Sequence, residues 1–157
     1  VSKPRQQNSG LSKTPKSQAS RKKPAQSSAD QSAKEQQAFA LVNQGKLQEA
    51  EAIYRELISA GTGNHIVYGN LAAICLIQSR HDKSIPLLRK ALQLEPNHPE
   101  AHNNLGIALK EEGYLTYAIA SYSTALELKP NYPEALNNLS IAELLAGDYE
   151  SGLKRYE

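Results

Sequence analysis

Two kinds of side chain in this sequence are spaced so that they could do chemistry together. His98 and His102 lie four residues apart, a spacing at which two imidazoles on one helix can hold a metal ion. Asparagines recur at intervals of 34 residues, and each side-chain amide offers both hydrogen-bond donors and an acceptor. The recurring residues are Asn70, Asn103, Asn104, Asn137 and Asn138. The spacing thus singles out a histidine pair, which could hold a metal ion, and a set of repeated amides.

The sequence disfavours the metal site. Pro99 lies between His98 and His102, and no third ligand is suggested nearby. No Gly-rich phosphate loop, nucleophile elbow or CxxC motif is present. We therefore expect no catalytic residue, metal or cofactor, and no enzyme within this sequence. Four acidic residues are expected on solvated helix faces: Asp82, Glu111, Glu112 and Glu143.

The overall composition averages two different parts of the chain. Residues 1–30 carry seven basic side chains against one acid, a formal charge of +6. They are too polar to bury enough surface to offset the entropy of ordering them, which predicts a disordered basic tail. The cluster Arg21-Lys22-Lys23-Pro24 suggests either an electrostatic arm or a solubilising leader. The leader is favoured, and nucleic acid is not expected as a partner, because the tail has no aromatic residue to stack on a base.

No segment looks built for a membrane or for secretion. No apolar run approaches the roughly 20 residues that span a bilayer, and the N-terminus has no signal-peptide h-region. Cys75 is the single cysteine, which rules out an internal disulfide, and its position predicts a buried core thiol. We therefore expect a cytoplasmic location and no membrane insertion.

Beyond the tail, the sequence repeats itself with a period of 34 residues. The block 103–108 recurs at 137–142, and 69–74 is a third copy of it. The block 92–97 likewise recurs at 126–131. Such a period is the signature of a repeat architecture in which each unit is one small group of helices.

Each unit is predicted to form two helices. Leu105, Ala108 and Leu109 lie on one helix face by their i, i+3, i+4 spacing. Gly113 then ends that helix, and Pro133 suits the first position of a later one. A lone pair of such helices cannot bury its apolar face, whereas stacked copies can. The predicted units after the tail (1–30) are 31–64, 65–98, 99–132 and a truncated 133–157.

These units resemble the tetratricopeptide repeat family over residues 31–157. The positions at which that family favours a particular residue type hold Leu105, Gly106, Ala118, Tyr122, Ala125 and Pro130 in the third unit. The first unit is divergent, with Thr62 in place of the final Pro. The resemblance implies an all-α, right-handed superhelical solenoid of antiparallel helix pairs.

The resemblance also implies where a ligand lies. Such arrays bind an extended peptide or protein in a concave groove lined by the first helix of each pair, and one position of that helix faces the groove. Here it holds Gln36, Asn70, Asn104 and Asn138, with Asn103 and Asn137 beside it. The sequence leaves open whether these amides contact a peptide or serve local packing.

One subclass of the family is disfavoured. Its carboxylate clamp needs basic side chains at positions that hold Glu35 and Glu100 here. The recurring asparagines look more like the array of O-linked N-acetylglucosamine transferases and related bacterial proteins. The leading hypothesis is a protein-interaction scaffold. The alternative is the non-catalytic front of a glycosyltransferase or methyltransferase, whose catalytic domain would follow Glu157. Self-association through the unfinished last unit is a third hypothesis.

Overall fold

Seven helices make up the part of the chain that the computed structural model describes, residues 28–147, and no strand occurs there. The predicted tail up to residue 27 and residues 148–157 of the fourth predicted unit lie outside it. The helices are α1 (Ser28–Asn43), α2 (Leu47–Ser59), α3 (His65–Ile77), α4 (His81–Leu94), α5 (Pro99–Glu111), α6 (Leu115–Leu128) and α7 (Pro133–Leu145). The predicted all-α solenoid is confirmed, whereas the unit boundaries remain a prediction.

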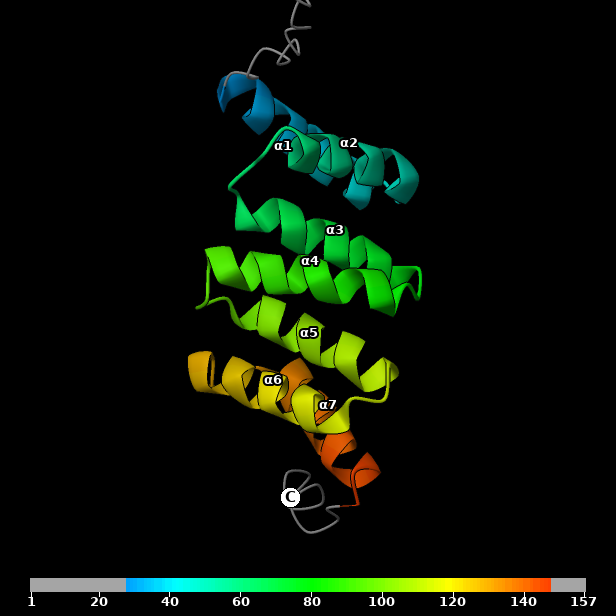
Figure 1. The fold of residues 1–157 in the computed structure, drawn as a ribbon, viewed down its shortest axis with the longest axis vertical. Helices are drawn as coiled ribbons and strands as arrows, with labels where there is room; N and C mark the ends of the chain where they lie inside the picture. The colour runs from blue at the N-terminus through cyan, green and yellow to red at the C-terminus, as the bar shows by residue number, and fades with distance from the viewer. Residues whose placement is uncertain (1–27, 148–157) are drawn as a thin grey trace, which may run out of the picture.

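The helices form a stack in which each one packs on its neighbours in sequence (Figure 1). The first helices of successive pairs also touch, since α3 contacts α5 and α5 contacts α7. Within the described chain, no comparable contact joins α2 to α4 or α4 to α6. The stack is therefore packed more closely along its first helices, which places α3, α5 and α7 on its inner, concave side.

The turn inside each pair depends on a residue with positive φ. Gly113 has φ of 83°, and the backbone N–H of Tyr114 donates to the carbonyl of Leu109 to close the end of α5. Ser79 takes the same place after α3 with φ of 55°, and no other non-glycine residue in the described ranges has a positive φ. This left-handed conformation is costly for a residue with a Cβ atom. The 34-residue period thus also applies to the backbone geometry of the turns, although the turn after α3 has Ser79 in place of the favoured glycine.

The start of the first helix is also fixed locally in two pairs. The Asn64 side chain accepts a hydrogen bond from the backbone N–H of Ile66 at 3.0 Å, which caps α3. His98 does the same for α5 through Nδ1, which accepts from the Ala101 N–H at 3.3 Å. Each cap accepts from a backbone donor of the first helical turn, although the Ala101 N–H also bonds to the carbonyl of His98.

Large and small side chains alternate in the core between pairs. Tyr54, Leu88 and Tyr122 occupy the same place in three successive second helices, and all are fully buried. Gly106 of α5 lies against the Tyr122 ring, where even a Cβ atom would be crowded. The sulfur of Cys75 is also buried, as predicted. These contacts bury the apolar faces that a single pair would leave open.

An ion pair joins the first two pairs of helices. Both terminal nitrogens of the Arg80 guanidinium donate to the Glu51 carboxylate, at 2.6 and 3.0 Å, and Arg55 adds two further hydrogen bonds from within α2. These hydrogen bonds, that of Arg80 first, lower the pKa of Glu51 to about 2 despite its partial burial. The pair therefore fixes α2 against the turn before α4.

The predicted exposure of one acidic residue is wrong. Asp82, Glu111 and Glu112 are exposed as expected, but Glu143 is only 6% exposed. It lies 34 residues after Leu109, which is also buried, and so it occupies the inward face of α7. Helix geometry places this side chain inside the stack whatever its polarity.

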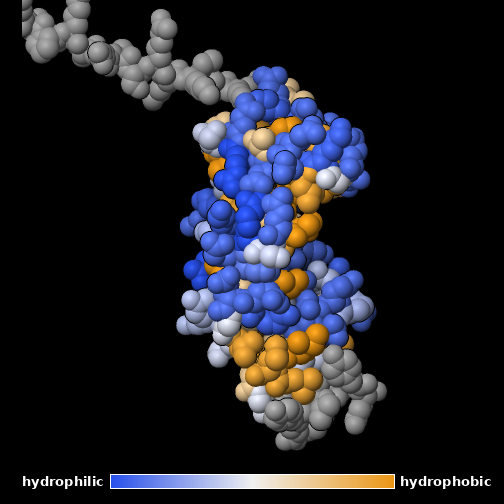
Figure 2. Space-filling model, turned by 90° about the vertical axis from the view of Figure 1, so that its right-hand side faces the viewer, coloured by the Kyte–Doolittle hydropathy of each residue, from blue (hydrophilic) through white to orange (hydrophobic). Residues whose placement is uncertain are grey.

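Hydrophilic and apolar side chains are unevenly distributed over the surface of the helix stack. Figure 2 shows a largely hydrophilic face with apolar side chains gathered toward the end where α6 and α7 lie. Leu136 and Leu145 of α7 are 37% and 61% exposed. Among residues 28–147, no helix combines the length and apolarity needed to cross a membrane.

Candidate functional site

A small hollow of about 110 Å³ lies between α3 and α5, on the side of the stack where the first helices meet. Small side chains leave this space open, because Gly69 and Ala73 stand where larger residues would fill it. The residues around it are His65, Ile66, Gly69, Asn70, Ala73, Ala91, His98, Glu100, Ala101 and Asn104. Two of the five predicted amides, Asn70 and Asn104, therefore share one hollow.

Asn70 is held in place by the preceding pair of helices. Its Nδ2 donates to the hydroxyl of Tyr54 at 3.1 Å, and the Tyr54 ring is buried in the core. Burial is also the main cause that raises the pKa of Tyr54, so this hydroxyl stays neutral. The contact orients the Asn70 amide at the wall of the hollow.

Asn104 lies at the equivalent place one repeat later but has no such anchor. The residue corresponding to Tyr54 is Leu88, which has no hydroxyl. Within residues 28–147, no hydrogen bond engages the Asn104 side chain. Because the side chain is only partly buried, its amide is available to a ligand in the hollow.

Asn138 and Asn103 form a hydrogen bond with each other and do not line this hollow. Asn138 Nδ2 donates to Asn103 Oδ1 at 3.1 Å, which links α7 to α5. Asn103 is only 4% exposed. Asn137 is exposed on α7, away from the hollow between α3 and α5. The structure thus separates the five amides into a hollow-lining pair, a bonded pair and one surface residue.

A carboxylate stands at the rim of the hollow. Glu100 lies 3.2 Å from Lys129 Nζ and 3.3 Å from His98 Nδ1. Burial raises its pKa, but hydrogen bonds from its own backbone and from Lys129 outweigh that effect and lower the pKa overall. The rim therefore carries a negative charge that the Lys129 ammonium partly balances.

The histidines proposed as a metal pair have other roles. His98 caps α5 and meets the His65 ring edge-on, with centroids 5.3 Å apart. His102 Nε2 bonds to the carbonyl of Pro96 at 2.9 Å. Across the described ranges, no three His, Cys, Asp or Glu side chains are grouped to hold a metal ion.

The role of Tyr54 is a feature that the sequence analysis missed. Its hydroxyl precedes Asn70 by 16 residues, and the same spacing relates Leu88 to Asn104 and Tyr122 to Asn138. That spacing could have shown which asparagine has a hydroxyl partner. The last pair has the spacing but not the hydrogen bond. Asn138 bonds to Asn103, and the Tyr122 hydroxyl is buried without a partner among the described residues.

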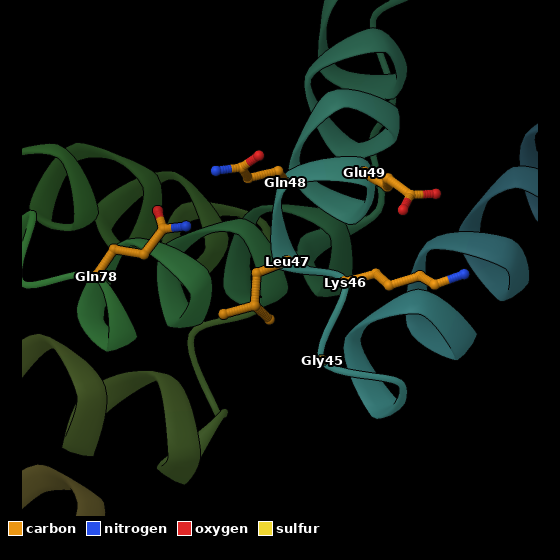
Figure 3. Close-up of a pocket in the computed structure, with 6 residues that line it drawn as sticks. All are labelled: Gly45, Lys46, Leu47, Gln48, Glu49 and Gln78. Atoms are coloured by element: carbon orange, nitrogen blue, oxygen red, sulfur yellow. The ribbon is translucent and has the colours of Figure 1, made fainter.

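A second hollow, of about 380 Å³, lies at the turn between α1 and α2 (Figure 3). Its lining is mostly polar, and Lys46 and Glu49 point away from Gln78. Leu47 is its single large apolar residue. It lacks the convergent polar groups and apolar walls of a ligand site, so the hollow between α3 and α5 is the better candidate.

Comparisons with known proteins agree on one architecture. Residues 72–113 and 109–147 match the family described as TPR repeat. The human protein O-mannosyl-transferase TMTC1 is 31% identical over 117 residues, covering 72% of this chain and 13% of its own length. The chain therefore spans only a small part of that relative.

Solved structures show the same fold. The protein MamA from Desulfovibrio magneticus RS-1 matches with a TM-score of 0.76 and 19% identity, over 82% of this chain and 73% of that one. The first TPR of Spaghetti (RPAP3), solved with the HSP90 peptide SRMEEVD, matches with a TM-score of 0.75 and 22% identity. That match covers 80% of this chain and 99% of the other.

Proposed function

Because the chain belongs to the tetratricopeptide repeat family, we propose that it is a protein-interaction scaffold. Its first helices α3, α5 and α7 form a concave groove for an extended peptide or protein segment. In this proposal the chain binds its partner and carries no catalytic residue of its own. Peptide binding by a protein of the same fold, the first TPR of RPAP3, supports this function.

The observation that carries the proposal is the free amide of Asn104 beside the anchored amide of Asn70. Every residue of an extended peptide presents an N–H and a C=O that need partners when they leave water. A side-chain amide meets both needs without reading the peptide's side chains. The pair therefore grips a backbone, while the hollow between them receives a small side chain.

The other predicted residues take supporting roles. Asn138 and Asn103 hold α7 against α5 and so shape the groove beyond the hollow. Asn137, which is exposed on α7, is a further candidate contact for a long ligand. The primary contacts are thus Asn70 and Asn104.

The charge around the hollow limits the ligand. Glu100 stands where the resemblance places a basic side chain of a carboxylate clamp. A peptide ending in acidic residues, such as SRMEEVD, would meet a negative rim. We therefore expect an internal or basic segment rather than an acidic C-terminus.

The test uses peptides selected from a phage-displayed random library on the folded protein. Their affinities are then measured by fluorescence anisotropy on Asn70→Ala, Asn104→Ala and Asn138→Ala combined. A loss of more than tenfold supports the groove, with unchanged helicity by circular dichroism. The matched control is Asn131→Ala, an exposed amide in the loop before α7. Equal affinity of the triple variant and the control would exclude the proposed contacts.

The second candidate function is substrate selection for a glycosyltransferase or methyltransferase. The similarity to part of human protein O-mannosyl-transferase TMTC1 favours the first of these. Sequencing the C-terminal peptides of the protein from its natural source would test it. A sugar-nucleotide or methyl-donor domain beyond Glu157 would support the idea, and a chain made only of repeats would exclude it. Cytoplasmic location and self-association through α7 remain predictions.

A further inference from the structure

Two adjoining hollows lie outside the groove, on the second helices. One, of about 360 Å³, is bounded by α4, by the end of α5 and by the start of α6. The other, of about 530 Å³, runs along the outer face of α4. They share Ile85 and Arg89, so they form one continuous surface, which we call the α4–α6 face.

Two tyrosines dominate the first hollow. Tyr114 is 54% exposed and Tyr117 is 68% exposed, next to the apolar side chains of Ile85 and Leu109. Exposed tyrosines beside apolar side chains are typical of the residues that supply most of the free energy in protein interfaces. This hollow therefore offers an anchor point for an apolar side chain of a partner.

The repeats themselves show that the fold does not require these tyrosines. The places of Tyr114 and Tyr117 hold Arg80 and Lys83 one repeat earlier. Two repeats earlier they hold Lys46 and Glu49. All three turns close in the same way, so charged side chains suffice there. The aromatic pair is thus specific to the third repeat and needs an explanation other than folding.

The charge of this surface differs from that of its surroundings. Residues 28–147 carry nine basic and thirteen acidic side chains, yet α4 has three basic ones against Asp82 alone. Arg89 and Lys90 are exposed along the second hollow, and Arg89 makes no ion pair within the described part. A positive surface on an otherwise negative domain attracts acidic ligands.

We propose that the α4–α6 face docks an acidic, extended segment of a partner protein. Carboxylates of the segment pair with Arg89 and Lys90, and an apolar side chain inserts among Tyr114, Tyr117 and Ile85. Arginine suits this role because its planar guanidinium binds a carboxylate through two parallel hydrogen bonds. The groove lies on the first helices and this face on the second, so both sites can be filled together.

The same residue types could also suggest single-stranded nucleic acid, since tyrosines stack on bases. The apolar walls of Ile85 and Leu109 argue against it, because they suit an aliphatic side chain of a peptide. Three basic side chains on one helix also give little room to follow a phosphate backbone. An acidic protein segment fits the lining better.

The experiment measures the fluorescence anisotropy of a labelled synthetic peptide with the repeating unit Glu-Pro-Leu. Proline keeps this peptide extended, and glutamate and leucine supply the proposed contacts. The comparison probes are a Lys-Pro-Leu peptide and an oligothymidylate. We expect the acidic peptide to bind and both comparison probes to bind at least tenfold more weakly.

Two exposed substitutions locate the binding site. Arg89→Glu and Tyr117→Ser should each weaken binding of the acidic peptide about tenfold. Lys46→Glu makes the same charge change in the turn before α2, outside this face, and should have little effect. Asn104→Ala should leave this affinity unchanged, which separates the face from the groove. Circular dichroism checks that each variant is folded. The proposal is overturned if the acidic peptide fails to bind, if Arg89→Glu and Lys46→Glu behave alike, or if either comparison probe binds equally well.

Discussion

Gly106 and Tyr122 are in such close contact that a Cβ atom on the glycine would lie 2.5 Å from Cε1 of the tyrosine ring. The ring is fully buried and cannot move toward solvent. One repeat earlier the corresponding residues are Ala72 and Leu88, where a smaller side chain leaves room for a methyl group. The first pair of helices combines Ala38 with Tyr54, so the close contact between Gly106 and Tyr122 is a feature of the third repeat and not of every repeat.

Gly106→Ala should accordingly lower the free energy of unfolding by about 1–3 kcal/mol, because the added methyl group overpacks the core. The double variant Gly106→Ala, Tyr122→Leu copies the preceding pair and should lose less than the sum of the two single changes. Urea unfolding followed by circular dichroism measures all three. Strict additivity would show that the two residues are not coupled.

Ser79→Gly should raise stability by about 0.5–1 kcal/mol. The left-handed conformation costs roughly 1–2 kcal/mol for a residue with a Cβ atom, and the greater freedom of glycine in the unfolded chain offsets part of the gain. Ser123→Gly in the middle of α6 is the matched control and should destabilise. Thermal unfolding compares them, and a lower melting temperature for Ser79→Gly would contradict the argument.

The Glu51–Arg80 pair should make stability depend on pH in acid. The pKa of Glu51 is lowered to about 2 in the folded chain, so its contribution is complete above its unfolded pKa near 4.5 and is lost as pH falls toward 2. Glu51→Gln should remove that part of the pH dependence. Because water partly screens the pair, we expect a contribution of about 1 kcal/mol. Unfolding measured between pH 6 and pH 2 tests it.

Asn104 and Asn138 should differ in what their removal changes. Asn104→Ala should weaken a selected groove peptide and leave stability nearly unchanged, because no hydrogen bond within residues 28–147 uses that side chain. Asn138→Ala should lower the free energy of unfolding by about 1–3 kcal/mol, since it leaves the buried Asn103 oxygen without its donor. Parallel anisotropy and unfolding measurements distinguish them, and equal profiles would contradict these roles.

The sequence predicts the fold well because its strongest signals repeat. Gly113 and the 34-residue period indicate helix pairs before any contact is known, and Cys75 follows as a core residue. The predicted exposure of Glu143 is wrong because its helix position, which matches that of Leu109, decides its burial and its charge does not. Position within a repeat decides burial here more reliably than residue type.

The site is less predictable because residues at the same repeat position have different neighbours in each repeat. Asn70, Asn104 and Asn138 occupy one repeat position, yet their amides meet a hydroxyl, no described partner and another amide, respectively. The difference arises from side chains in neighbouring helices. The sequence pattern of one repeat unit does not show which side chains the neighbouring helices supply.

The restriction of contacts to neighbouring helices has a consequence for how the chain gains and loses its structure. In the described part α1 rests mainly on α2, whereas α5 is held by α3, α4, α6 and α7. Ordering can therefore start near α5 and spread outward one helix at a time, as in a one-dimensional chain of coupled units. Amide protons of α5 should exchange with solvent most slowly and those of α1 fastest. We therefore expect the most persistent helix of the domain to be α5, which is the helix that carries Asn104.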